Sequence, residues 1–334
     1  MGRGPLVRRL AAIALAGATG LAGVAIPAAL GAAGAGCGST AYRRLDRGIA
    51  RAGLSPDAVA RHLALVGEGD RLWAERSNPA RLEAALARWE AAVALQDDDW
   101  RTYTRLARGY FFQADAVFAF QASAGRYPYD GKDGADPLAA RRYREAHRRG
   151  FAAALRGMAA RSREFEARLR AGMEMDRALL VIGPDAAGLM YWYVANLGRW
   201  SRSAGLGALL RARSAILAGM YHLRSIDPSY FHAGADRLLG VYYAAAPRMA
   251  GGDLARSRAH FEAALRAAPA YLGTAVLAAE FLDRKAHDRA SFEARLRAVA
   301  AARPDLAPDL EPENAVERRK ARALLERAGT YFHP

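Results

Sequence analysis

Residues 240–269 have the sequence GVYYAAAPRMAGGDLARSRAHFEAALRAAP, and the fold class follows from their pattern. Asp253 can cap a helix N-terminus, good helix formers fill residues 254–267, and Pro269 ends the run. Apolar side chains share one face of this helix, at Leu254, Phe261, Leu265 and Ala268. Such a stripe needs a neighbouring helix to bury it. The stretch therefore predicts a helix that packs against the helix before it.

Small and aromatic residues in the same stretch have the spacing of a tetratricopeptide repeat, a helix–turn–helix unit of about 34 residues. Its second-helix frame of small residue, aromatic, Ala and closing Pro is matched by Ser257, Phe261, Ala264 and Pro269. An earlier match, with Asp97 in the place of Pro, is formed by Ala85, Trp89 and Ala92. Gly240 and Tyr243 fit the first helix, and residues 247–253 lengthen the unit. These degenerate repeats predict an all-α fold of antiparallel helix pairs stacked into a solenoid or bundle.

The rest of the chain carries further helix signals. Residues suited to N-capping precede expected helices at Ser55, Asn78, Asp288 and Asn314. Asn314 has Glu317 three residues on, which approximates a capping box, and proline ends helices at positions 228 and 304. Alternating runs of Val, Ile and Thr, typical of strands, do not occur in the sequence. We expect residues 54–334 to form one helical repeat domain.

The first 36 residues have the parts of a secretory signal peptide. Basic residues stand at the start, at Arg3, Arg8 and Arg9, and residues 10–36 carry no charge. Positive charge stays on the cytoplasmic side while the apolar run enters the bilayer, so we expect export. The uncharged run exceeds the ~20 residues that span a bilayer, which leaves an uncleaved anchor as the alternative. The Arg8-Arg9 pair also leaves a twin-arginine signal open.

Cys37 is the only cysteine and directly follows this leader, so it cannot form an internal disulfide. The sequence GAGCGS at 34–39 resembles a bacterial lipoprotein cleavage site, although Gly34 stands where an aliphatic residue is usual. We expect lipidation of Cys37, with a thiol of no special role as the alternative. Residues 37–53 would then form a tether and a short leading helix. The expected location is periplasmic and membrane-tethered.

The chain is strongly basic, with a formal net charge of +15. Nucleic acid is a common partner of basic proteins, but export excludes it. Attraction to anionic lipid headgroups is one remaining explanation. A solvated, Arg-rich surface is the favoured one, because the arginines are dispersed along the chain.

The sequence offers no constellation of catalytic or metal-binding residues. Its seven histidines are dispersed, and it has neither a GxSxG elbow nor a GxxxxGK loop. Gly251-Gly252-Asp253 is interpreted as a turn with an N-cap, and Asp97-Asp98-Asp99 as a solvated turn. We expect no enzymatic activity, no metal and no cofactor. An enzyme with a helical cleft is the least favoured alternative.

Consecutive aromatic residues on three expected helices are the candidates for a binding surface. Neighbours on a helix are about 100° apart, so they cannot all face the same core. Tyr and Trp suit amphipathic pockets because they join an apolar body to a polar tip. The candidate ligand- or partner-binding residues are Tyr110, Phe111, Tyr191, Trp192, Asn196, Tyr242 and Tyr243. Ordinary packing between helices is the alternative.

The order of several motifs resembles the T component of TRAP transporters, the TatT family. The strongest stretch contains GVYY at 240–243, Pro247, GGD at 251–253, HFE at 260–262 and Ala264-Leu265. Further similarity lies in LMYW at 189–192 with Ala195 and Gly198, in GYF at 109–111, and in residues 314–325. The resemblance spans roughly residues 45–332, while residues 125–137 are interpreted as an insertion.

This resemblance implies an all-helical periplasmic lipoprotein with cryptic tetratricopeptide repeats and no enzymatic role. It implies a partner, the periplasmic solute-binding protein of a TRAP transporter. It further implies a homotrimer with a central pore and a cleft suited to an apolar ligand. The alternative is a general envelope scaffold that recruits proteins or peptides through its concave helical face.

Overall fold

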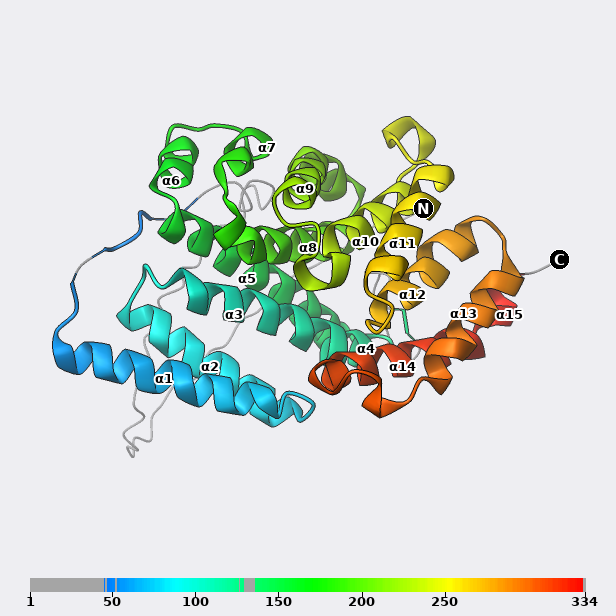
Figure 1. Cartoon of the computed structure of the whole chain (residues 1–334), viewed down its shortest axis with the longest axis horizontal. Helices are drawn as coiled ribbons and strands as arrows, with labels where there is room; N and C mark the ends of the chain where they lie inside the picture. The colour runs from blue at the N-terminus through cyan, green and yellow to red at the C-terminus, as the bar shows by residue number, and fades with distance from the viewer. Residues whose placement is uncertain (1–44, 46, 52, 126, 129–135, 333–334) are drawn as a thin grey trace, which may run out of the picture. The chain divides into compact units, whose positions relative to one another are not determined.

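The computed structural model describes residues 45, 47–51, 53–125, 127–128 and 136–332. The expected signal peptide and Cys37 therefore lie outside the described residues, as does most of the expected insertion at 125–137. All regular secondary structure in the described part of the chain is helical, which confirms the all-α prediction (Figure 1).

The longer helices are α1 (Pro56–Ala74), α2 (Pro79–Leu95), α3 (Trp100–Gln113), α5 (Pro137–Arg161), α8 (Ala187–Ser203), α9 (Leu206–Ile226), α10 (Tyr230–Ala245), α11 (Leu254–Ala267), α13 (Arg289–Ala301) and α14 (Glu311–Glu326). The shorter ones are α4 (Ala119–Ala122), α6 (Arg163–Arg170), α7 (Met175–Ala178), α12 (Gly273–Leu277) and α15 (Ala328–Tyr331). Two π-helical turns, η2 (Ala114–Phe118) and η6 (Ala278–Asp283), continue α3 and α12. Short 3₁₀ turns are η3 (Leu179–Val181), η4 (Pro184–Ala186), η5 (Arg248–Ala250), η7 (Pro304–Leu306) and η8 (Pro308–Leu310).

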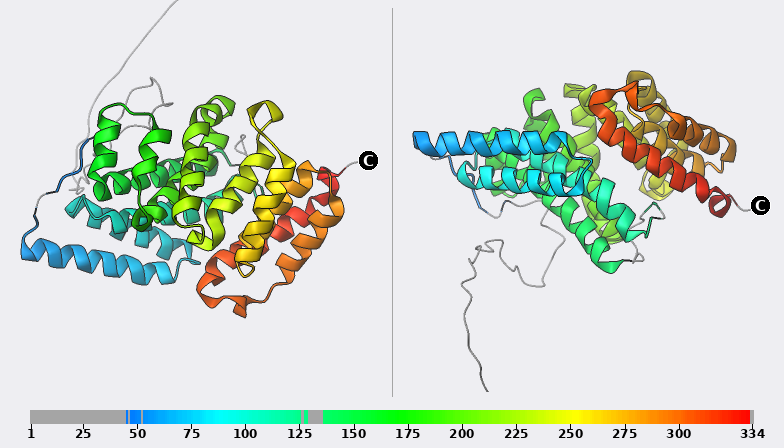
Figure 2. Two further views of the ribbon diagram at one scale, coloured as in Figure 1. Left: turned by 45° about the horizontal axis from the view of Figure 1, so that its top comes forward. Right: turned by 90° about the horizontal axis from the view of Figure 1, so that it is seen from below.

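The long helices pack mainly on their neighbours along the chain. α1 packs on α2, α2 on α3, α3 on α5, α5 on α8 and α8 on α9. The later pairs are α10 with α11 and α13 with α14, and α13 and α14 lie alongside α12 (Figure 2). The helix-pair arrangement expected from the apolar stripes is therefore present.

The pair α10–α11 shows how the sequence pattern produces this packing. Ser257, Phe261 and Ala264 are all buried on the face of α11 that meets α10. The Ser257 hydroxyl donates a 2.8 Å hydrogen bond to the carbonyl oxygen of Gly240. A β-carbon at Gly240 would lie only 2.8 Å from Cδ2 of Phe261, so the glycine lets the two helices approach closely. The assignment of these pairs as tetratricopeptide repeats stays a prediction.

Most of the predicted helix boundaries hold. Ser55, Asn78, Asp253 and Asp288 each accept a backbone N–H in the first turn of the next helix, as capping residues do. The prediction that Asn314 caps a helix is wrong, because α14 already begins at Glu311, next to Pro312, and Asn314 lies inside the helix. Its buried amide instead donates to the Ala270 carbonyl and accepts from the Leu272 N–H.

The short leading helix expected within residues 37–53 stays a prediction, because about half of that stretch lies outside the described residues; residues 45, 47–51 and 53 carry no helix. The backbone N–H groups there bond to side chains of the helical body instead of to each other. Ile49 N–H donates to Glu166 and Ala50 N–H donates to Asp97, both at 2.9 Å. This segment is fixed to Glu166 of α6 and to Asp97 in the turn between α2 and α3 before α1 begins.

Helix α8 occupies the centre of the largest core. Its residues 189–197 are all buried, whichever side of the helix they face. Helix α5 packs closely on α8 because Gly157 has no side chain: a β-carbon there would lie 2.4 Å from Cδ2 of Leu189. Among the described residues, no single helix is long and apolar enough to cross a bilayer; Met175–Val181 and Pro184–Ser203 reach that length only together, across a bend of 117°.

Candidate ligand-binding site

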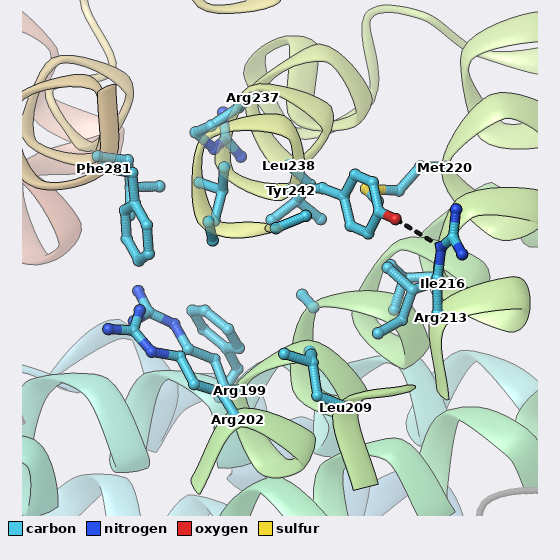
Figure 3. A pocket seen from close by; sticks show the side chains of 18 of the residues that line it. Arg199, Arg202, Leu209, Arg213, Ile216, Met220, Arg237, Leu238, Tyr242 and Phe281 are labelled. Atoms are coloured by element: carbon cyan, nitrogen blue, oxygen red, sulfur yellow. Dashed lines mark hydrogen bonds between the residues drawn. The ribbon is translucent and has the colours of Figure 1, made fainter. Parts of the chain in front are cut away.

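A cavity of about 160 Å³ lies between α8, α9 and α10 (Figure 3). Its walls are mainly aliphatic, with Leu209, Ile216 and Met220 from α9 and Leu238 and Val241 from α10. The space exists because α8 turns small side chains toward it, at Ala195 and Gly198. A β-carbon at Gly198 would meet no atom within 4 Å. The cavity is therefore an apolar space with room at the α8 side.

One end of the cavity is charged. Lys320 of α14 is buried and its ammonium group bonds to both Asp115 and Glu317, at 2.7 Å for Glu317. Arg199 of α8 lies 3.9 Å from Asp115. Burial alone would raise the pKa of Asp115, but the charges of Lys320 and Arg199 hold it below its usual value. Burial outweighs Lys320 at Glu317 and raises the pKa of that carboxyl group.

Both π-helical turns supply residues to this charged end. Asp115 belongs to η2, and Phe281, whose ring lies beneath the guanidinium of Arg202 at 4.8 Å, belongs to η6. A π-helical turn changes the direction of the side chains that follow it, and such turns are frequent at functional sites. Here the two turns bring segments about 165 residues apart in sequence to one cavity.

Arg237 forms the wall on the α10 side. It is buried, and its guanidinium donates to the Tyr191 hydroxyl at 2.7 Å and to the carbonyls of Phe231 and His232 at 3.0 and 2.8 Å. These two carbonyls belong to a left-handed turn at the start of α10, where Phe231, His232 and Ala233 have φ values of 43°, 60° and 55°. Arg237 thus holds a strained turn against the cavity wall.

A family model described as the TRAP transporter T-component matches residues 80–332, and all of the residues that line the cavity lie within this match. The chain belongs to the TRAP transporter T-component family. T-components are accessory subunits of TRAP transporters, so membership of this family associates the chain with such a transporter. The family is not known for enzymatic activity. A comparison with curated proteins gives no significant match.

The sequence of this T-component suggested seven aromatic and polar residues as candidates for binding. Three of them lie in the wall of the cavity, namely Phe111, Tyr191 and Tyr242. The Tyr242 hydroxyl accepts from Nε of Arg213 at 2.8 Å and donates to the Ala250 carbonyl at 2.9 Å (Figure 3). Trp192 lies behind this wall, beside a small adjoining cavity of about 20 Å³. Its ring packs on Phe111 and Phe231.

The structure places the other three candidates away from the cavity. Tyr110 is buried against Glu90 of α2, under the guanidinium of Arg149. Asn196 is buried in the core, where its amide bonds to His147 and to the Ala107 carbonyl, each at 3.0 Å. Tyr243 faces α11 and stacks on His260 at 5.6 Å between ring centroids.

The cationic residues of the site were not anticipated from the sequence. Arg199 and Arg202 stand one turn apart in a helix that is otherwise largely apolar from 187 to 198, and this contrast was the available signal. Lys320 gave no such signal, because it lies among many charged residues of α14.

The prediction of a solvated turn at Asp97–Asp99 is wrong for Asp97. Asp97 is buried rather than solvated, and it accepts hydrogen bonds from Ala50, Tyr103 and Arg156.

The described residues contain no group of three or more His, Cys, Asp or Glu side chains arranged to hold a metal ion.

Proposed function

We propose that this T-component binds an apolar ligand in the cavity between α8, α9 and α10, and that the periplasmic solute-binding protein of its TRAP transporter docks over the cavity mouth. The observation that carries the proposal is the aliphatic cavity itself, which opens beside exposed apolar side chains. Ligand sites are typically concave and mostly apolar, with a few polar groups that fix orientation.

The size and lining of the cavity support a ligand rather than a packing defect. An engineered apolar cavity of about 150 Å³ takes up benzene, and the volume here is similar. The ring of Tyr242 and the side chains of Leu209 and Ile216 offer apolar contact on several sides. Leu206 and Leu210 line the space while being 63% and 52% exposed, so a ligand can reach it from solvent.

The same exposed leucines support a docking surface for the solute-binding protein. Met249, in the turn after α10, is 95% exposed, and this turn is held beside α9 through Tyr242 and Arg213. Leu206 and Leu210 therefore form an apolar rim at the mouth, and Met249 adds an exposed apolar side chain in the turn that Tyr242 holds. Exposed apolar patches of this kind mark interaction sites. The family match favours this transporter-associated role over a general envelope scaffold.

The ligand part is tested by filling the cavity. Gly198→Leu projects a side chain into open space, so the protein should fold while binding of the neutral fluorescent probe 1-aminoanthracene falls at least tenfold. Gly329→Leu is the matched control, because a β-carbon at that helical glycine also meets nothing within 4 Å and Gly329 does not line the cavity. Equal probe binding by both variants would contradict the proposal.

The docking part is tested by pull-down of the purified solute-binding protein. Leu206→Asp should reduce capture at least tenfold, because it places a charge in an apolar rim. Leu63→Asp is the control, since Leu63 of α1 is equally exposed at 62%. Loss of capture in both variants, or in neither, would argue against docking at the mouth.

The tether and the oligomeric state stay proposals that rest on the sequence. Cys37→Ser should release the protein from membranes if Cys37 is the lipidated residue, whereas an uncleaved leader would retain it. Native mass spectrometry of the purified protein should give a homotrimer, and a monomer would exclude that state.

A further inference from the structure

Cations outnumber carboxylates around the candidate cavity. Five cationic side chains line it, at Arg199, Arg202, Arg213, Arg237 and Lys320, against two carboxylates, at Asp115 and Glu317. Both carboxylates are engaged by Lys320. The cavity is therefore mainly aliphatic, with more positive than negative charge among the side chains that line it.

Two of these arginines have no ionic partner among the described residues. No described carboxylate lies within 4.0 Å of the guanidinium groups of Arg202 and Arg237, and Arg237 is bonded only to neutral oxygens. Arg202 instead lies against the ring of Phe281. Removing a cation from water without a counter-charge is unfavourable, so this wall would bind an anion more readily than a neutral group.

Two of the five cationic side chains, Arg199 and Arg202, lie together at one end of the cavity. Arg199 and Arg202 are three residues apart on α8 and so share one face of the helix. Figure 3 shows both guanidinium groups reaching toward the same end of the cavity, opposite Phe281, while Leu209 and Ile216 line the region beyond them. A ligand that fits both halves has a charged head and an aliphatic tail.

From this arrangement we infer that the T-component binds a single-chain aliphatic carboxylate, with its head at Arg202, on the same helix face as Arg199, and its tail along α9. The inference rests on the proposed ligand cavity and names the class of its ligand. Planar guanidinium groups match a carboxylate with two parallel hydrogen bonds. The enclosed volume of about 160 Å³ takes only part of one such chain, and the rest of the tail passes out beside the exposed side chains of Leu206 and Leu210. The two chains of a phospholipid do not fit.

The test displaces 1-aminoanthracene from the purified full chain with ligands that share one ten-carbon tail. Decanoate should displace the probe at about tenfold lower concentration than decanol, because the head gains charge-assisted hydrogen bonds. Decylammonium should be weaker than decanol. Decyl phosphate completes the series as a different anionic head on the same tail.

Variants assign the effect to the head site. Arg202→Gln should remove most of the preference for decanoate over decanol while leaving probe binding intact, and Arg202→Lys should restore part of it. Arg266→Gln is the control, since this side chain is 74% exposed and does not line the cavity. Probe binding itself shows that each variant retains a folded cavity.

The outcomes separate this inference from the proposed function. If the probe binds and decanol competes as well as decanoate, the apolar cavity stands and the carboxylate inference fails. Tighter displacement by decyl phosphate than by decanoate also overturns it, because the head group would then be a phosphate. If the probe does not bind the wild-type protein at all, both proposals fail.

Discussion

The Arg237 guanidinium and the Tyr191 hydroxyl are joined by a 2.7 Å hydrogen bond that links α10 to the central helix α8. Through the same guanidinium, Arg237 also holds the left-handed turn that begins α10. One side chain thus fixes the position of the turn, the direction of α10 and one wall of the cavity. Its removal should affect stability as well as ligand binding.

Arg237→Met should lower the free energy of unfolding by about 3 kcal/mol, because two turn carbonyls and the Tyr191 hydroxyl lose their donor in a buried site. Urea unfolding followed by circular dichroism measures this. The exposed control Arg266→Met should stay within about 0.5 kcal/mol of wild type. A loss below 1 kcal/mol for Arg237→Met would show that the turn holds without it.

The left-handed turn predicts a difference between two glycine substitutions. Ala233 has φ of 55°, where a β-carbon is strained, whereas the nearby Ala235 is buried and helical. Glycine relieves the strain at the first site and weakens the helix at the second. Ala233→Gly should therefore leave the protein at least 1 kcal/mol more stable than Ala235→Gly does. Equal melting temperatures for the two variants would contradict the left-handed geometry.

Stability should fall with acid through His147. Burial lowers the pKa of this imidazole to about 3, although Asn196 opposes the shift. Its pKa in the unfolded chain is near 6.5, so the unfolded state takes up a proton first as the pH falls. The stabilisation is complete above about pH 6.5 and is lost progressively down to about pH 3. Between pH 7 and pH 5 this amounts to about 2 kcal/mol.

The comparison that isolates His147 is wild type against His147→Gln, each unfolded in urea at pH 7 and pH 5. Gln can still donate to Asn196 but does not titrate. The wild type should lose about 2 kcal/mol more than the variant over this interval. If both proteins lose the same amount, other groups cause the acid sensitivity.

Asp97→Asn should release the segment before α1. Asp97 accepts the Ala50 N–H and pairs with Arg156, and burial is outweighed by these donors, which lower the pKa of Asp97. Hydrogen exchange of the Ala50 amide should accelerate at least tenfold in the variant, with little change in the melting of α8 and α9. Asp98→Asn, in the same turn, is the control. Unchanged protection of Ala50 would refute the role of Asp97.

Local rules predicted the helices well because capping and apolar stripes act over a few residues. Ser55, Asn78 and Asp253 behave as the sequence indicates. Asn314 does not, since its partners Ala270 and Leu272 are more than forty residues away and outweigh its local preference for a cap.

The candidate site was only partly predictable for a related reason. Helix α8 is buried on every side, so its periodicity does not show which aromatic faces a cavity and which faces the core. Tyr191 lines the cavity, while Asn196, five residues further along the same helix, packs in the core. The charged end depends on Lys320 meeting Asp115 across 205 residues, and no local pattern records that encounter.

The segment at residues 49–51 also determines how the molecule carries mechanical load. A pull on the chain from its N-terminal side reaches the helical body at the carboxylates of Glu166 and Asp97 before it reaches α1. Force would therefore pass into α6 and into the turn between α2 and α3 before it reaches α1. If the preceding residues tether the protein to a membrane, the side chains of Glu166 and Asp97 would bear the tension before α1 does.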